Sequence, residues 1–264
     1  MNRPIAFVLA SSDHGTMIVN RNDYQMSDPT SGIGVGFDIL NCSAYDRPGV
    51  GIGTKLLHLR RKHFGDGVVA IDCGANIGVM TVEWARAMTG WGRVVAVEAQ
   101  ERTFYALAGN IALNNLFNAS ALHAAVGESY DETMIIPQLD PSIPSNFGGL
   151  ELRPRNGNWV GQPFDALPPV FVNMVTVDSL VLPRVDLIKI DVEGMEPEAL
   201  EGAEDTIARD HPMMIVECIR NGEALRETLT GMGYRLMRSG INFVAIHESD
   251  PGLAAVKQNE REAA

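Results

Sequence analysis

The sequence predicts an α/β protein built on a doubly wound, mostly parallel sheet. From residue 68 onward, apolar runs of strand length alternate with segments of helical length. Two of these runs flank one helical segment and end in polar residues, the first at Asp72 and the second at Glu98, as in a βαβ unit. The last two runs are joined only by Ser239 and Gly240, and a connection this short requires an antiparallel hairpin at the sheet edge.

Length and composition favour one large domain with small additions. The 264 residues can bury a sizeable core. We expect an N-terminal extension over residues 1–64, a main domain over 65–250 with an insertion at 137–169, and a tail over 251–264. No apolar run approaches the roughly 20 residues that cross a bilayer, and nothing resembles a secretory signal, so we expect a cytoplasmic protein without membrane contacts.

The extension differs from the rest of the chain in the length and spacing of its apolar runs. Short apolar runs at residues 7–10, 17–20 and 37–40 predict strands, and residues 55–64 predict a helix. Two Gly-x-Gly-x-Gly patterns begin at Gly32 and Gly49, but neither follows a convincing strand, and turns are the expected structure. The basic run Arg60–His63 is expected to form a solvated helix face.

The main domain alternates strands and helices in a regular order. The expected strands are residues 68–73, 94–98, 119–126, 186–191, 213–217, 235–238 and 242–247. The expected helices are residues 81–88, 102–114, 197–208 and 222–232, and Pro197 suits a first helical position. The insertion leaves strand 119–126 at the end where open sheets bind ligands. Its aromatic residues, including Phe147 and Trp159, favour a substrate-covering segment, with a disordered surface loop as the alternative.

The first polar constellation indicates a nucleotide cofactor. In Asp72-Cys73-Gly74-Ala75-Asn76-Ile77-Gly78, the glycines permit tight turns and close approach of a ligand. A dinucleotide site has Gly-x-Gly-x-x-Gly here, whereas this chain has an acid, which suits the ammonium group of S-adenosylmethionine. Glu98 can accept both hydroxyls of a ribose. The alternative is a strand, turn and helix with no ligand.

The second constellation lies on strand 186–191. Lys189, Asp191 and Glu193 alternate and can share one face, yet a central parallel strand should be apolar on both faces. The functional hypothesis places Asp191 and Glu193 beside a transferred methyl group, where a carboxylate can act as a base for a hydroxyl acceptor. Glu217, at the end of the next strand, is a third acid at this edge. The alternatives are a self-satisfied Lys–Asp pair, with Glu193 capping the following helix and Glu217 as a helix N-terminal charge.

Charge and metal-binding residue types exclude other functions. The net charge of −12 argues against a nucleic-acid partner and favours a small or uncharged substrate. The three cysteines have no Cys-x-x-Cys spacing and suit a reducing compartment, and the six histidines do not pair at ligand spacings. We therefore expect no zinc site and no bound metal.

Residues 68–220 resemble the FkbM family of S-adenosylmethionine-dependent methyltransferases. The most specific match is Ile190-Asp191-Val192-Glu193-Gly194-x-Glu196 followed by Leu200-x-Gly202-Ala203, and residues 71–78 and Glu98 also match. Further similarities are residues 175–180 and Asn146 with Gly148-Gly149. In the extension, only Tyr45-Asp46 stands where the family often has Tyr-Glu.

The resemblance implies a class I methyltransferase fold, Rossmann-like, with a seven-stranded sheet whose last strand is antiparallel. It implies O-methylation of a hydroxyl on a sugar, polyketide or other secondary metabolite, and a small-molecule or glycan partner; a homodimer is compatible with it. The implied cofactor-binding residues are Asp72, Gly74, Ala75, Asn76 and Gly78 for the methionine part, Glu98 for the ribose, Ala125 and Val126 for the adenine, and Asp191. The candidate catalytic residues are Asp191, Glu193 and Glu217, and the candidate substrate contacts are Lys189, Asn146, Phe147 and His247.

The sequence also bears on two other classes of function. A nicotinamide-dependent oxidoreductase would require the missing glycine pattern and a Tyr-x-x-x-Lys pair, which the chain lacks. A non-catalytic protein that binds the cofactor would carry the same cofactor residues as an enzyme.

Overall fold

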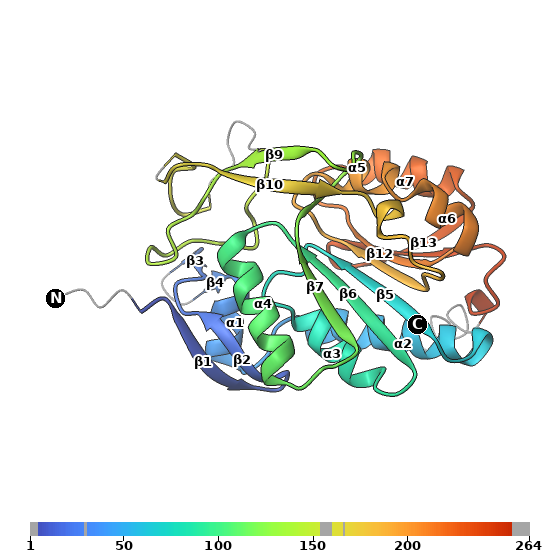
Figure 1. Ribbon diagram of the computed structural model, residues 1–264, viewed down its shortest axis with the longest axis horizontal. Helices are drawn as coiled ribbons and strands as arrows, with labels where there is room; N and C mark the ends of the chain where they lie inside the picture. Colours follow the sequence, from blue (N-terminus) through green and yellow to red (C-terminus); the bar gives the residue numbers. More distant parts are fainter. Residues whose placement is uncertain (1–4, 29–30, 154–159, 166, 255–264) are drawn as a thin grey trace.

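The computed structural model describes residues 5–28, 31–153, 160–165 and 167–254, and it shows one central sheet between helical layers (Figure 1). Trp159, parts of the insertion and residues 255–264 of the tail lie outside the described residues. The seven-stranded sheet has the order β13 (Tyr234–Ser239), β14 (Asn242–His247), β12 (Met213–Glu217), β11 (Leu187–Ile190), β5 (Val68–Cys73), β6 (Gly92–Glu98) and β7 (Ala119–His123).

Strand directions confirm the predicted fold class. The five strands from β12 to β7 are mutually parallel, and β14, the last strand of the chain, is antiparallel to both β12 and β13. Ser239 and Asn242 pair across the short connection that predicted a hairpin. The bounds of β5, β12 and β14 agree with the expected strands, because their apolar runs are bounded by polar and glycine residues.

Helices cover both faces of the sheet (Figure 1). One face carries α5 (Glu196–Glu201), α6 (Glu204–Asp210) and α7 (Gly222–Gly231), which bury Leu200 and Leu225 in a cluster with Ile71 of β5. The opposite face carries α1 (Val35–Cys42), α2 (Arg47–Phe64), α3 (Val79–Ala87) and α4 (Glu101–Leu113). There, Leu57 and Trp84 pack with Ala70 of the same strand, as the alternation of side chains along a buried strand requires. No described helix has the length and apolar character of a membrane span.

Two predicted elements of the main domain are divided in the structure. The helix expected at 197–208 breaks into α5 and α6 at Gly202. A Cβ at Gly202 would meet the carbonyl oxygen of Gly127. At the start of α6, the Asp178 carboxylate accepts the N–H groups of Asp205 and Thr206. The strand expected at 119–126 ends at His123. Its remainder, β8 (Ala125–Val126), joins β9 (Thr133–Ile136) and β10 (Val170–Val175) in a separate three-stranded sheet that the sequence analysis missed.

The extension differs most from the prediction. Its hairpin, β1 (Phe7–Ser12) and β2 (Gly15–Asn20), is close to the expected strands, and β3 (Gln25–Met26) pairs with β4 (Gly32–Ile33). The strand expected at 37–40 was wrong, because these residues belong to helix α1. The turn expected at Gly49–Gly53 was also wrong: these residues lie in α2, which begins at Arg47 and is capped by Asp46 accepting the N–H of Gly49. A Cβ at Gly53 would overlap Trp84, so this glycine permits close packing of α2 and α3.

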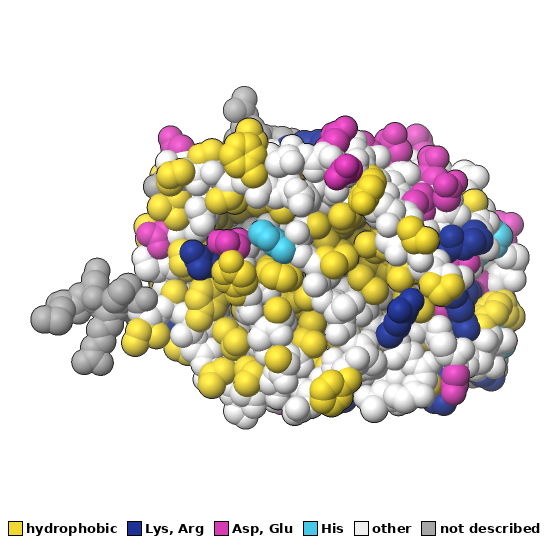
Figure 2. All heavy atoms as spheres, viewed as in Figure 1, with side chains coloured by type: hydrophobic (Ala, Val, Ile, Leu, Met, Phe, Trp, Pro, Cys, Tyr) yellow, Lys and Arg dark blue, Asp and Glu magenta, His cyan; other side chains and the backbone are white. Residues whose placement is uncertain are grey.

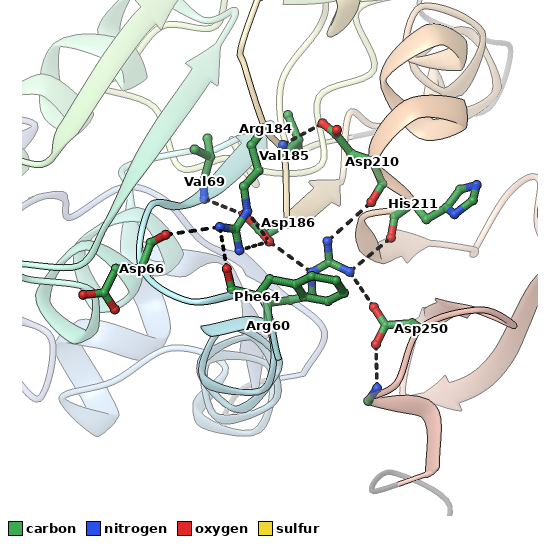
Figure 3. Close-up of polar contacts among 11 residues, drawn as sticks. Arg60, Phe64, Asp66, Val69, Arg184, Val185, Asp186, Asp210, His211 and Asp250 are labelled. Atoms are coloured by element: carbon green, nitrogen blue, oxygen red, sulfur yellow. Dashed lines mark hydrogen bonds and ion pairs between the residues drawn. The ribbon is translucent and has the colours of Figure 1, made fainter. Parts of the chain in front are cut away.

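The basic run on α2 is only partly a solvated face. Arg60 is buried, which corrects the prediction, and its guanidinium binds the buried carboxylates of Asp186 (Nε to Oδ1, 3.1 Å) and Asp250 (Nη1 to Oδ2, 2.5 Å) (Figure 3). It also donates to the carbonyl oxygens of Asp210 and His211. This network joins α2 to the amino-terminal edge of the parallel strands, opposite the edge where the predicted site lies.

The extension and the insertion are joined through one buried carboxylate. Asp23 accepts the N–H groups of Gly36 (2.9 Å), at the start of α1, and of Phe147 (3.0 Å), in the insertion. Asn22 strengthens this connection by donating its side-chain amide to the carbonyl oxygen of Pro141 and accepting the N–H of Ser145 on its own carbonyl oxygen. The two segments expected to shape the substrate side therefore contact each other directly.

Replacement of Asp23 by asparagine is expected to remove one component of the pH dependence of stability. Burial raises the pKa of Asp23 from 3.8 to about 6, and nearby Asp38 adds to the rise, although N–H donors oppose it. Since the folded pKa exceeds the unfolded one, the stability this group contributes is present below about pH 4 and is lost as pH rises through 6. In urea unfolding, the free energy of unfolding of Asp23→Asn relative to that of the wild type should be roughly 1–3 kcal/mol more favourable at pH 7 than at pH 4. A difference independent of pH would contradict this.

Candidate functional site

The predicted polar residues gather at the carboxyl ends of β5, β6, β11 and β12. These strands are parallel neighbours, so their ends form one edge of the sheet. Lys189 lies directly opposite Asp72 in the β11–β5 register, and directly opposite residues point to the same face. That face is the one covered by the extension and α3, and the site is built on it.

The loop after β5 has the conformation that its glycines permit. Gly74, Asn76 and Gly78 all have positive φ (74°, 52° and 90°), which is uncommon for a residue with a side chain such as Asn76. A Cβ at Gly74 would overlap the carbonyl oxygen of Asp191, and one at Gly78 would overlap the Leu107 side chain. These glycines therefore bring the loop against β11 and α4. This packing holds Ala75 and Asn76 at the edge of the site.

Glu98 ends β6 and binds this loop. One of its oxygens accepts the N–H of Asn76 (2.9 Å), and the other accepts the N–H of Gln100 (2.8 Å). Burial raises the pKa of Glu98 to about 7, although the two N–H donors act against the rise. Each oxygen keeps a second lone pair for another donor. Glu98 thus fixes the loop while retaining acceptor capacity toward a ligand.

Lys189 joins the two polar constellations. Its ammonium group is nearly buried and lies 3.0 Å from Asp191 Oδ2 and 3.6 Å from Asp72 Oδ1, and it donates to the carbonyl oxygen of Gly74 (3.2 Å). Burial would lower the pKa of Lys189, but the charges of Asp191 and Asp72 outweigh it and raise the pKa. The Lys–Asp pair considered as an alternative is therefore present. It engages one oxygen of Asp191, whose side chain is still 32% exposed.

Asp72 is fully buried beneath the loop. Its Oδ2 accepts the hydroxyl of Thr81 (2.6 Å). Its Oδ1 receives no hydrogen bond from the described residues and faces the Lys189 ammonium. Among the described residues, the polar contact of this oxygen is therefore the ion pair with Lys189 alone.

Three carboxylates converge at the ends of β11 and β12. One oxygen from each of Asp191, Glu193 and Glu217 lies within 4.8 Å of the other two. Glu193 turns back from the strand at a positive φ of 51° and pairs with Arg220 (2.8 Å). It does not cap α5 as the alternative proposed, because no side chain caps the described N-terminus of this helix.

The three carboxylates of this group repel one another electrostatically. Burial, followed by the charges of Asp191 and Glu193, raises the pKa of Glu217 to about 8. Burial and Asp191 raise the pKa of Glu193 to about 7, while Arg220 opposes the rise. The site therefore holds more negative charge than its two basic side chains balance.

The insertion lies against the motif through main-chain and amide contacts. The carbonyl oxygen of Phe147 accepts the side-chain amide of Gln100 (2.8 Å), and a Cβ at Gly148 would lie 3.1 Å from the side-chain nitrogen of Asn76. The Phe147 ring is buried in a small cluster with Leu139 and Leu150. Asn146 accepts the N–H of Gly149 on its side chain, which shapes the turn. These residues position the insertion at the site edge.

Three predicted residues lie apart from this group. His247 pairs with Tyr234 at the opposite end of the sheet and stacks on His211 with ring centroids 3.7 Å apart, so the structure does not bring it to the other candidates. Ala125 and Val126 form β8 and are buried in the hydrophobic core on the α5–α7 side. The expectation of a substrate contact from His247 does not agree with its placement.

Tyr45 of the extension is a residue whose side chain the charges of the site affect. Burial, and then the charge of Asp191, raises the pKa of Tyr45. Buried His14 accepts the Tyr45 N–H (2.9 Å) on Nε2 and contacts Glu83 (2.8 Å) through Nδ1. About 145 residues separate Tyr45 from Asp191 in the sequence, and only the Tyr-Asp pair hinted at a role. Arg220 gave no sequence signal at all.

The surface over α5, α6 and α7, on the face of the sheet opposite the site, is acidic. Figure 2 shows Asp and Glu side chains gathered over α5, α6 and α7. Exposed members of this group are Glu201, Glu204, Asp205, Glu223 and Glu227. A surface of this sign repels polyanions.

Comparisons with known proteins identify a family. The family model described as "Methyltransferase FkbM domain" matches residues 72–236, a range that contains both polar constellations. No curated protein matches the chain.

Similar solved structures are distant in sequence. A methyltransferase FkbM from Methylobacillus flagellatus KT is 17% identical, with a TM-score of 0.48, covering 74% of this chain and 50% of that one, so this chain spans half its length. A precorrin-6y C5,15-methyltransferase from Geobacter metallireducens GS-15 is 15% identical (TM-score 0.43, covering 78% and 89%). A tRNA (uracil-54, C5)-methyltransferase from Pyrococcus abyssi, in complex with S-adenosyl-L-homocysteine, is 13% identical (TM-score 0.41, covering 88% and 39%).

Proposed function

Because the chain belongs to the FkbM family of methyltransferases, we propose that it transfers a methyl group from S-adenosylmethionine to a hydroxyl of a small-molecule or glycan acceptor. The observation that carries this proposal is the position of Glu98 and Asp191 at one sheet edge, joined through the Gly74 loop and Lys189. A donor site and a proton acceptor are thereby held next to each other.

The residues at this edge fit the proposed cofactor. Glu98 keeps acceptor capacity for ribose hydroxyls, and the buried Asp72 carboxylate adds negative charge beneath the loop, which suits an ammonium group there. When bound, the cofactor supplies a methyl group on a positively charged sulfur. The excess of carboxylates at the edge favours that positive charge.

The chain's own groups then handle the acceptor. Asp191 is the most accessible carboxylate of the three and can take the proton that the acceptor hydroxyl loses. Lys189 fixes the orientation of Asp191. The insertion lies against the edge of the site through the contact of Phe147 with Gln100. The acidic surface and the net charge of −12 favour a small neutral acceptor over a nucleic acid.

Substitution of Glu98 by alanine is expected to reduce S-adenosylmethionine binding at least tenfold. The change removes both ribose acceptors and releases the N–H of Asn76, so the loop loses its anchor. Isothermal titration calorimetry of both proteins measures the difference. Glu101→Ala, at the first residue of α4 and partly exposed, is the control and should bind like the wild type. Equal affinity in Glu98→Ala, or no binding by the wild type, would overturn the cofactor assignment.

The acceptor is identified by incubating the protein with labelled S-adenosylmethionine and an extract of the source cells, followed by untargeted mass spectrometry. A labelled small molecule or glycan supports the proposed function. Cofactor binding without any labelled product would favour a non-catalytic protein.

A further inference from the structure

The acidic group at the end of β11 and β12 has the composition of a cation site. Asp191, Glu193 and Glu217 each place one oxygen within 4.8 Å of the others. Carboxylate oxygens are the ligands of hard divalent cations such as Mg²⁺, Mn²⁺ and Ca²⁺. These three side chains come from two neighbouring strand ends, so one ion could bridge them.

The nearby basic side chains do not balance all of the negative charge of these three carboxylates. Lys189 divides its contacts between Asp191 and Asp72, and Arg220 divides its contacts between Glu193 (2.8 Å) and Glu151 (2.6 Å). The shortest contacts to the group are Lys189 Nζ to Asp191 Oδ2 (3.0 Å) and Arg220 Nη1 to Glu193 Oε2 (2.8 Å), and neither cation is given to the group alone.

The side chain of Glu217, unpaired among the described residues, is an independent observation that indicates a cation at this position. Its side chain is aimed into the group, it is only 5% exposed, and it makes no hydrogen bond or ion pair with any described residue. A buried carboxylate without a partner is costly, and native structures usually supply a counter-charge or donor. Here the open partner position faces Asp191 and Glu193.

We propose that Asp191, Glu193 and Glu217 bind one divalent cation of the Mg²⁺ or Mn²⁺ type. The cation supplies the partner that Glu217 lacks, and its remaining positions accept oxygen ligands. The proposal that the ion binds here does not depend on the proposed function. The proposal that its oxygen ligands include the acceptor hydroxyl does rest on the proposed function.

The test uses the full chain after treatment with a chelator, with Mn²⁺ alone as the probe. Calorimetry and the electron paramagnetic resonance signal of free Mn²⁺ should show one saturable site per chain in the wild type. Glu217→Gln should weaken Mn²⁺ binding at least tenfold, whereas Glu204→Gln, an exposed acid on α6, should stay within twofold. Thermal melting shows whether each variant is folded, and Glu193→Gln, in a partly exposed position, is the second ligand variant.

The outcomes separate the two proposals. Absence of saturable Mn²⁺ binding in the wild type overturns the cation site, as does unchanged affinity in folded Glu217→Gln and Glu193→Gln. S-adenosylmethionine binding is measured in the chelator-treated protein without metal. Loss of that binding would count against the proposed function and leave the Mn²⁺ result intact.

Discussion

Replacement of Arg60 by methionine is expected to lower the free energy of unfolding by about 3–5 kcal/mol. The substitution keeps a long apolar stem against Phe64, over whose ring the guanidinium lies at 4.1 Å, but it removes the only cation shown to contact Asp250 among the described residues. Asp250 is almost fully buried and would remain as an uncompensated carboxylate (Figure 3). Urea unfolding at pH 7 measures the loss.

Arg184→Met is the matched control for this prediction. Arg184 also binds Asp186 (2.8 Å), but it is partly exposed, and Asp186 would keep Arg60 as its partner. Its loss should therefore cost roughly 1 kcal/mol. The double variant Arg60→Met with Asp250→Asn should recover part of the stability lost in Arg60→Met, because the unpaired charge is gone. Equal losses in the two single variants would contradict the network described here.

The parallel core of the fold could be predicted because its signals are local. Each apolar run of the seven-stranded sheet contains its own strand pattern, and the short connection at Ser239 determines the direction of the last strand. The three-stranded sheet was missed because β8 and β9 contribute few residues and β10 follows a long insertion. Pairing between such distant segments leaves no periodic signal in a single sequence.

The extension was harder to predict because tertiary contacts override its local composition. The glycines at the start of α2 favour turns by propensity, yet the Asp46 cap begins a helix there and Gly53 allows contact with Trp84. Arg60 shows the same effect for charge. Its position in a basic run suggested exposure, whereas its partners Asp186 and Asp250 lie 126 and 190 residues away.

The candidate site was predictable where a strand end determines position. Asp72, Glu98, Lys189 and Asp191 follow from strand register alone. The partners Arg220 and Tyr45 lie on connecting segments, whose paths a single sequence does not determine. His247 was misplaced because β14 runs antiparallel, which carries its last residue to the opposite edge from that of Glu217.

Asp191→Asn is expected to lower methyl transfer about 10²- to 10⁴-fold while the protein stays folded. The amide keeps the size of the side chain but cannot accept the acceptor's proton. Lys189 would still have Asp72 and the carbonyl oxygen of Gly74 as partners, so the buried ammonium remains compensated. Transfer of labelled methyl groups into the small-molecule fraction of a source-cell extract measures turnover, and calorimetry should show S-adenosylmethionine affinity within a few-fold of the wild type.

Lys189→Met separates a catalytic role of Asp191 from a structural one. Removal of Lys189 leaves fully buried Asp72 with Thr81 as its only side-chain partner among the described residues, and it should cost about 3–5 kcal/mol of stability. Asp191→Asn should melt within a few degrees of the wild type, because one face of Asp191 is already open to solvent. If Asp191→Asn unfolds as readily as Lys189→Met, the ion pair is a structural element and Asp191 is not the base. If it melts normally and also retains full turnover, another group at the β11–β12 edge must accept the proton.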